Sequence, residues 1–156
     1  MNRDDYLNTC ATLLGRLIHE IKAHNAIGRF DINSVTEDFL VPIVRTLFDC
    51  PDLKNQNQIQ QNFPAIDLGC RTSRISFQVT TDASSDKVET TLANFCEHGL
   101  RKDFDSVYIL ALTEKQSVYK AKSLVKIISE LGLPFEVSKH ILDVRDLLQR
   151  LKNLDT

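Results

Sequence analysis

The chain has 156 residues, of which 42% are hydrophobic and 26% are charged, and its formal net charge is -2. This length and composition predict one globular domain over residues 1–156, with a core of ordinary size. The slightly negative charge excludes a general electrostatic attraction to nucleic acids or anionic membranes, so any nucleic-acid contact requires a local basic patch.

The N-terminal residues lack the apolar run of a signal peptide, and no stretch approaches about 18 apolar residues. We therefore expect a cytoplasmic protein that does not bind membranes. The four cysteines form no CxxC pair, and the four histidines are scattered along the chain. This spacing argues against a structural zinc site and against a disulfide framework, and it predicts reduced thiols.

Residues 4–25 place apolar side chains at helical spacing, and Gly28 follows as a stop signal. A second helix is expected to begin at Ser34, because Ser34 and Glu37 have the spacing of a capping box. This helix is predicted to turn Phe39 and its apolar neighbours inward. Pro42 lies too deep for a first turn, so we expect either a kink there or a start displaced toward Val41.

Residues 51–63 are rich in Asn and Gln and are expected to form a long polar connection. Two short strands, 65–68 and 74–80, follow, and the turn between them at 69–73 suits a hairpin.

The rest of the chain alternates helices and strands. The expected elements are a helix over 84–97, a strand over 107–112, a helix over 118–131, a strand over 135–142 and a last helix capped by Asp143. The order ααββαβαβα predicts an α/β domain with a mixed sheet flanked by helices.

The polar residues with the clearest chemical potential lie on the two hairpin strands. Side chains alternate along a strand, so Gln78 and Thr80 share one face, and hairpin pairing would bring Asp67 beside Gln78. A carboxylate, a second oxygen ligand and a backbone carbonyl, here that of Val79, are the hard ligands that Mg²⁺ prefers. The structural alternative is that Asp67 is a turn acid and that Gln78 lies on a solvated strand face.

Two further residues could complete such a site. Glu37 is expected on the same arc as apolar residues of its helix, an unusual place for a carboxylate without a partner. Its structural alternative is the reciprocal capping contact to Ser34. Lys87 falls in the first turn of a helix, where the positive end of the helix dipole disfavours a cation. It is either an active-site cation or a solvated surface lysine.

At this point the sequence resembles the SMEK domain, an N-terminal module of bacterial conflict and anti-phage proteins. The resemblance covers nearly the whole chain. The segments that carry it are 31–33 with 37–40, 62–69, 74–80, 84–87, and 140–143 with 145–148.

The resemblance implies a fold similar to the restriction-endonuclease-like PD-(D/E)xK superfamily. Pro64 and Asp67 would then supply the proline–acid element, Gln78 the second acidic position and Thr80 the lysine position. Gln78 still offers a ligand oxygen, whereas Thr80 cannot stabilise a charged transition state as a lysine does. Lys87 could replace that lysine from the following helix.

The resemblance therefore implies a metal-dependent endodeoxyribonuclease of anti-phage defence, with DNA as substrate and Mg²⁺ or Mn²⁺ as cofactor. Asp67, Gln78, Val79 and Glu37 would bind the metal, and Lys87 would stabilise the charged phosphate. The rival hypothesis is a catalytically silent module that mediates oligomerisation or senses a partner. Both hypotheses leave open a homo-oligomer, a fused domain or a separate subunit of a defence system.

Overall fold

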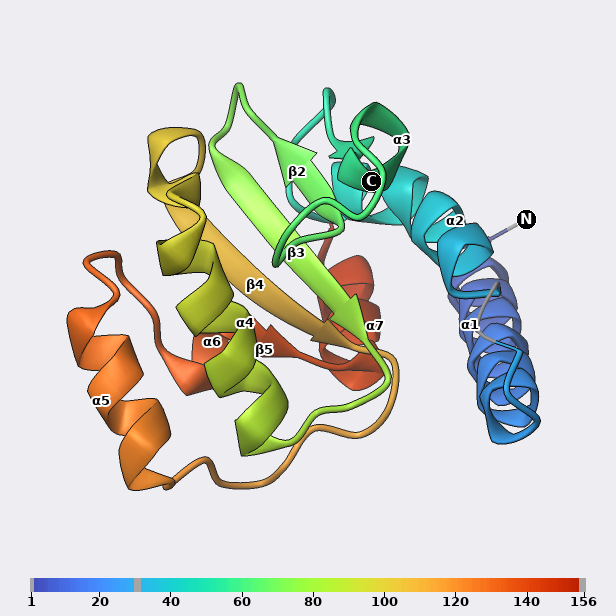
Figure 1. Ribbon diagram of the computed structural model, residues 1–156. Coiled ribbons are helices and arrows are strands. Elements are labelled where there is room, and N and C mark those ends of the chain that lie inside the picture. The colour runs from blue at the N-terminus through green and yellow to red at the C-terminus, as the bar shows by residue number, and fades with distance from the viewer. Residues whose placement is uncertain (1, 30–31, 155–156) are drawn as a thin grey trace.

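A mixed five-stranded sheet with helices on both faces forms the protein in the computed structural model, which describes residues 2–29 and 32–154 (Figure 1). The strands lie side by side in chain order: β1 (Lys54–Asn55), β2 (Leu68–Cys70), β3 (Ile75–Thr80), β4 (Ser106–Ala111) and β5 (Ile141–Leu142). The pairs β1–β2 and β2–β3 are antiparallel, and β3–β4 and β4–β5 are parallel. The predicted mixed α/β architecture is confirmed.

The helices divide into two layers around the sheet (Figure 1). Apolar side chains of α1, α2 and α7 form one core with the sheet, and those of α4 and α5 form a second core on the opposite face. The helices are α1 (Arg3–Ala26), α2 (Ile32–Leu47), α3 (Gln56–Ile59), α4 (Ser85–Glu97), the 3₁₀ helix η1 (Leu100–Lys102), α5 (Lys122–Glu130), α6 (Val137–His140) and α7 (Val144–Asn153).

The two cores follow from the alternation of side chains along β3 and β4. Phe77 packs in the core of α1, α2 and α7, whereas Ile109, the partner of Gln78 on β4, packs in the core of α4 and α5. Side chains of directly paired residues point to the same face, so Gln78 faces the layer that contains α4. The apolar run of β4 is thus covered on both faces, as its composition predicts.

The N-cap of α4 matters for the site because α4 carries Lys87. The Ser84 hydroxyl accepts the backbone N–H of Lys87 at 3.2 Å, which satisfies one of the free donors at the helix start. We expect Ser84→Ala to lower the free energy of unfolding by about 1 kcal/mol, measured by urea titration. Ser84→Asp should restore most of that stability, and an unchanged midpoint in Ser84→Ala would contradict the capping role.

The predicted start of the second helix is wrong. α2 begins at Ile32, so Ser34 lies inside the helix, and Pro42 is also inside it without displacing the start to Val41. Phe39 was expected to point into the core, yet 40% of it is exposed. It faces a groove between α1 and α2, where the first layer of helices is incompletely covered.

Several other boundaries differ from the sequence pattern. The polar connection 51–63 contains β1 and α3, and the first hairpin strand begins at Leu68 rather than at residue 65 because Ala65 has a positive φ of 64°. The strand expected over 135–142 is reduced to β5. The turn before β5 closes as α6, since His140 Nδ1 accepts the Glu136 N–H at 3.0 Å and the His140 N–H returns to the Glu136 carbonyl. The helix expected from residue 118 begins only at Lys122.

Asp143 caps α7 as predicted. Its carboxylate accepts the backbone N–H groups of Arg145 and Asp146, and Asp146 returns a contact to the Asp143 N–H. All four cysteines are free thiols, two of them, Cys50 and Cys70, fully buried. Within residues 2–29 and 32–154, no helix is both long and apolar enough to cross a membrane.

Candidate functional site

The β2–β3 hairpin places Asp67 at the carboxyl end of β3. Leu68 pairs with Phe77, so Asp67, the residue before β2, lies beside Gln78, as the hairpin pattern predicts. The Asp67 N–H donates to the Phe77 carbonyl at 2.8 Å. Its Oδ2 accepts the backbone N–H of Val79 at 2.8 Å. Two bonds to β3 therefore fix the direction of this carboxylate.

Glu37 reaches the same point from α2. Its Oε2 accepts Asn55 Nδ2 at 3.3 Å and Asn57 Nδ2 at 3.2 Å. The Asn57 amide also donates to Asp67 Oδ1 at 3.2 Å, so a single side chain bridges the two acids. The structural alternative for Glu37, a capping contact at the helix start, does not fit an α2 that begins five residues earlier at Ile32.

The two carboxyl groups perturb each other because they share a buried space. Burial and the neighbouring charge of Asp67 together raise the pKa of Glu37 from 4.5 to about 7, against the opposing effect of the Asn57 and Asn55 amides. Burial also raises the pKa of Asp67, although the Val79 N–H, the Asn57 amide and the charge of Lys87 oppose that rise. Hydrogen bonds therefore favour the charged form of Asp67, and Glu37 takes up or releases the shared proton near pH 7.

Lys87 lines the same pocket of about 260 Å³ as Asp67, Glu37 and Gln78. In the part of the chain that the structure describes, its amine has no hydrogen-bond or ion-pair partner. Its charge opposes the rise in the pKa of Asp67, and it adds to the hydrogen bonds with Ser84 that lower the pKa of Asp82. The pocket thus combines two acids with one unpaired cation.

The other two predicted residues of β3 also line the pocket, but they are engaged locally. Gln78 Nε2 donates to the Val79 carbonyl at 3.2 Å. The Thr80 hydroxyl donates to the Asp82 carbonyl at 3.2 Å and accepts the Asp82 N–H at 3.0 Å. Thr80 therefore shapes the turn after β3 and offers no positive charge.

The donor set fits a hard cation. The carboxylates of Asp67 and Glu37, the amide oxygen of Gln78 and the carbonyl of Val79 are all oxygen ligands, which suit Mg²⁺ or Mn²⁺ far better than Zn²⁺. A divalent cation would also neutralise two acids that burial and mutual repulsion otherwise disfavour. No group of three or more His, Cys, Asp or Glu side chains within 2–29 and 32–154 forms a metal site, so Gln78 or Val79 would have to contribute.

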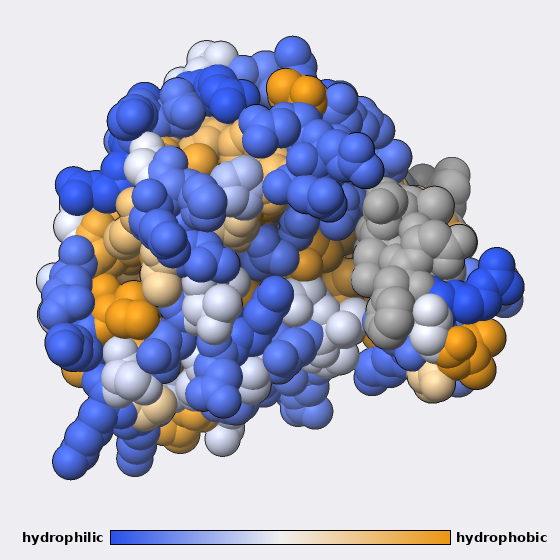
Figure 2. Space-filling view, viewed as in Figure 1, coloured by the Kyte–Doolittle hydropathy of each residue, from blue (hydrophilic) through white to orange (hydrophobic). Residues whose placement is uncertain are grey.

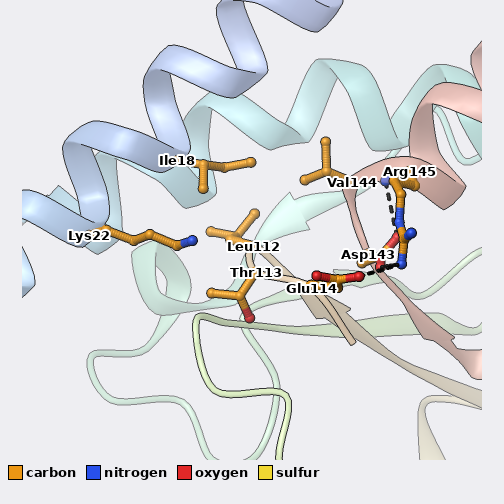
Figure 3. A pocket seen from close by; sticks show the side chains of 8 residues that line it. All are labelled: Ile18, Lys22, Leu112, Thr113, Glu114, Asp143, Val144 and Arg145. Atoms are coloured by element: carbon orange, nitrogen blue, oxygen red, sulfur yellow. Dashed lines mark hydrogen bonds and ion pairs between the residues drawn. The ribbon is translucent and has the colours of Figure 1, made fainter. Parts of the chain in front are cut away.

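A second pocket, of about 340 Å³, adjoins the first through Leu112, which lines both (Figure 3). Lys22 points into this pocket from α1. On its other wall Arg145 pairs with Glu114 at 3.1 Å and with Asp143 at 3.4 Å. The positive charges of Lys22 and Arg145 are balanced by the negative charges of Glu114 and Asp143. This pocket therefore adjoins the site but does not form a basic patch.

The residues that the sequence analysis missed are Asn55 and Asn57. Asn57 bonds to both acids and also accepts the Phe63 N–H at 3.0 Å, which ties the polar segment to the site. Asn55 caps α3 and holds Glu37 and Asp38. The available signal was the unusual Asn and Gln content of residues 51–63, which marked the segment without assigning a role to any one amide.

These observations can be set beside known protein families. The model of the SMEK domain matches residues 9–152, which is most of the chain, and the protein therefore belongs to the SMEK domain family. No curated protein and no solved structure shows significant similarity to it.

Proposed function

We propose that this SMEK domain is a metal-dependent nuclease, with DNA as its substrate. The observation that carries the proposal is the meeting of Asp67, Glu37 and Lys87 in one pocket at the carboxyl end of β3. Two acids and a free cation around a polar cavity are the groups that phosphodiester hydrolysis requires: ligands for a metal and a positive charge for the phosphate.

The electrostatics support this assignment. A fold gains no stability from two neighbouring carboxyl groups whose pKa values are both raised by burial, and such perturbed acids concentrate at functional sites. When bound, Mg²⁺ or Mn²⁺ would supply a Lewis acid and an activated water at this site.

The residues of the pocket would each have a separate role in this reaction. Asp67, held by β3, orients the cation site, and Glu37 holds a proton that it can release near neutral pH. Lys87 places its charge where negative charge develops on the phosphate. Asn57 is a positioning residue, because it acts through the two acids that it bridges.

The finer classification rests on the same site. We infer that the domain is a restriction-endonuclease-like variant in which the catalytic lysine has moved from the β3 position of Thr80 to the first turn of α4. An acid directly before β2 of the hairpin, a second oxygen ligand on β3 and a mixed sheet all support this assignment. Membership of the SMEK domain family fits a role as the effector of an anti-phage system.

The test of the proposal is cleavage of plasmid and linear DNA by the full chain with Mg²⁺ or Mn²⁺, with EDTA as the blank. Cation-dependent cleavage that Asp67→Ala abolishes would support it. Activity that survives both Asp67→Ala and Lys87→Ala would reject the site, and RNA cleavage under the same conditions would change the substrate class.

Lys87 gives the most specific result within this test. We expect Lys87→Gln to lower kcat by about tenfold or more while KM for DNA changes little, because the lost charge acts mainly on the transition state. Lys87→Arg should retain more activity than Lys87→Gln. Lys126→Gln, an exposed lysine of α5, is the matched control and should cleave like the wild type.

A second candidate function has its own support. Both oxygens of Asp67 already have protein donors, Gln78 and Thr80 replace an acid and a lysine, and the chain carries a net charge of -2. These features favour a nuclease-like module without activity that mediates oligomerisation or senses a partner. The absence of any cation-dependent change in unfolding temperature, together with no cleavage, would decide for this alternative.

A further inference from the structure

An apolar groove of about 410 Å³ runs between α1 and α2 and is also lined by α7, and it shares no lining residue with the acidic pocket. Three large side chains at its rim are open to solvent: Tyr6 is 52% exposed, Leu13 47% and Phe39 40%. On the face that Figure 2 shows, hydrophobic residues reach the surface only in small separate patches. The groove is therefore a surface that the described part of the chain leaves uncovered.

The helix that borders the groove stands at the edge of the molecule (Figure 1). α1 has 24 residues, about 36 Å in length, yet its only fully buried side chains are Leu14 and Ile21. Tyr6 and Leu13 lie two turns apart on one face of α1, so they form an exposed apolar stripe beside the groove. An exposed stripe of this kind marks a site of interaction.

Charges on α1 indicate what covers the stripe. Asp5 and Arg16 border the same edge of it, because positions 5, 9, 12 and 16 follow one another at helical spacing. Asp5 lies beside Tyr6 near the N-terminal end, and Arg16 lies one turn beyond Leu13. Within the described residues neither side chain forms an ion pair, and Arg16 has no polar partner.

This arrangement is self-complementary for two antiparallel helices. A two-fold axis across α1 between Tyr6 and Leu13 would set Tyr6 of one copy against Leu13 of the other. The same operation brings Asp5 of each copy opposite Arg16 of its partner on the shared edge, since a two-fold axis repeats every contact twice. A two-fold axis parallel to the helices would instead put this edge of the two copies on opposite sides of the seam, so Asp5 and Arg16 of the two copies would not meet.

We propose that the α1–α2 groove is a homodimer interface, formed by antiparallel packing of α1 against a second copy of this chain. The proposal does not depend on nuclease activity, because no residue that lines the groove also lines the acidic pocket. Each copy would cover the exposed Tyr6, Leu13 and Phe39 of the other.

Sedimentation of the full chain from low to high micromolar concentration tests the proposal. We expect a concentration-dependent dimer whose dissociation constant rises at least about tenfold in Leu13→Asp, because a leucine that the dimer covers is replaced by a charge. Val125→Asp on α5 is the matched control: Val125 is 57% exposed, and its substitution should leave the dimer unchanged.

A charge exchange tests the antiparallel arrangement without changing the apolar stripe. Asp5→Arg and Arg16→Asp should each weaken the dimer, and the double variant should recover most of the loss. A chain that stays monomeric at every concentration would overturn the proposal, as would equal effects of Leu13→Asp and Val125→Asp. If the double variant does not recover the dimer although Leu13→Asp still dissociates it, the antiparallel packing is wrong.

Discussion

Asp67→Asn is expected to lower cation-dependent DNA cleavage by about 100-fold or more while leaving the fold intact. The substitution removes the negative charge that a divalent cation needs, and kcat depends on that cation for both the nucleophile and charge neutralisation. The amide oxygen that remains can still accept the Val79 N–H, so the hairpin keeps its hydrogen bond, whereas the Asn57 amide loses its acceptor on residue 67. Removal of a buried charge beside Glu37 also relieves repulsion.

Activity and stability should therefore move in different directions in Asp67→Asn. Cleavage should fall, while the free energy of unfolding stays equal or rises. This combination is typical of residues that are retained for function although they destabilise the fold. Asp105→Asn is the matched control, because Asp105 is an exposed aspartate paired with Arg74 at 2.8 Å, remote from the pocket. If Asp67→Asn unfolds the protein instead, Asp67 is a structural turn residue and the proposed site fails.

The central part of this site could be predicted from the sequence because the relevant forces are local. A hairpin with alternating side chains fixes which residues of β3 share a face, and its turn fixes that Asp67 meets Gln78. Helix caps are equally local, so the capping role of Asp143 was recognisable from the sequence. The approach of Lys87 also follows from a short connection between β3 and α4.

Other contacts could not be predicted because they join distant segments. Asn57 bridges acids from α2 and the hairpin, 20 and 10 residues away in sequence, and no periodicity distinguishes it from the other amides of 51–63. The start of α2 was wrong for a related reason. A capping-box pattern identifies a favourable cap but does not prevent tertiary packing from extending the helix beyond it.

The proton of Glu37 leads to the second large effect. The pKa of Glu37 rises from 4.5 to about 7 on folding, so the folded protein holds more protons than the unfolded chain between these values. Stability must therefore fall as pH rises from about 4.5 to 7, and the loss is complete above the folded pKa. Below pH 4.5 both states carry the proton, and the carboxyl group adds no pH dependence.

Glutamine reproduces the protonated form of this residue at every pH. It can donate to Asp67 as the carboxylic acid does, and its oxygen can still accept the amides of Asn55 and Asn57. After allowance for the partial exposure of Glu37, we expect Glu37→Gln to raise the free energy of unfolding by about 2 kcal/mol at pH 8 and by little at pH 4.5. Urea titrations at the two pH values measure the difference.

Glu130→Gln, an exposed glutamate at the end of α5, serves as the control and should change stability by less than about 0.5 kcal/mol at either pH. A pH-independent gain in Glu37→Gln would mean that helix propensity, and not the shared proton, accounts for it. A gain in the free energy of unfolding that is confined to high pH would instead show that the ionised Glu37 destabilises the fold. Such a cost is understandable only if the carboxylate acts when it is ionised, which in this pocket means beside a bound cation.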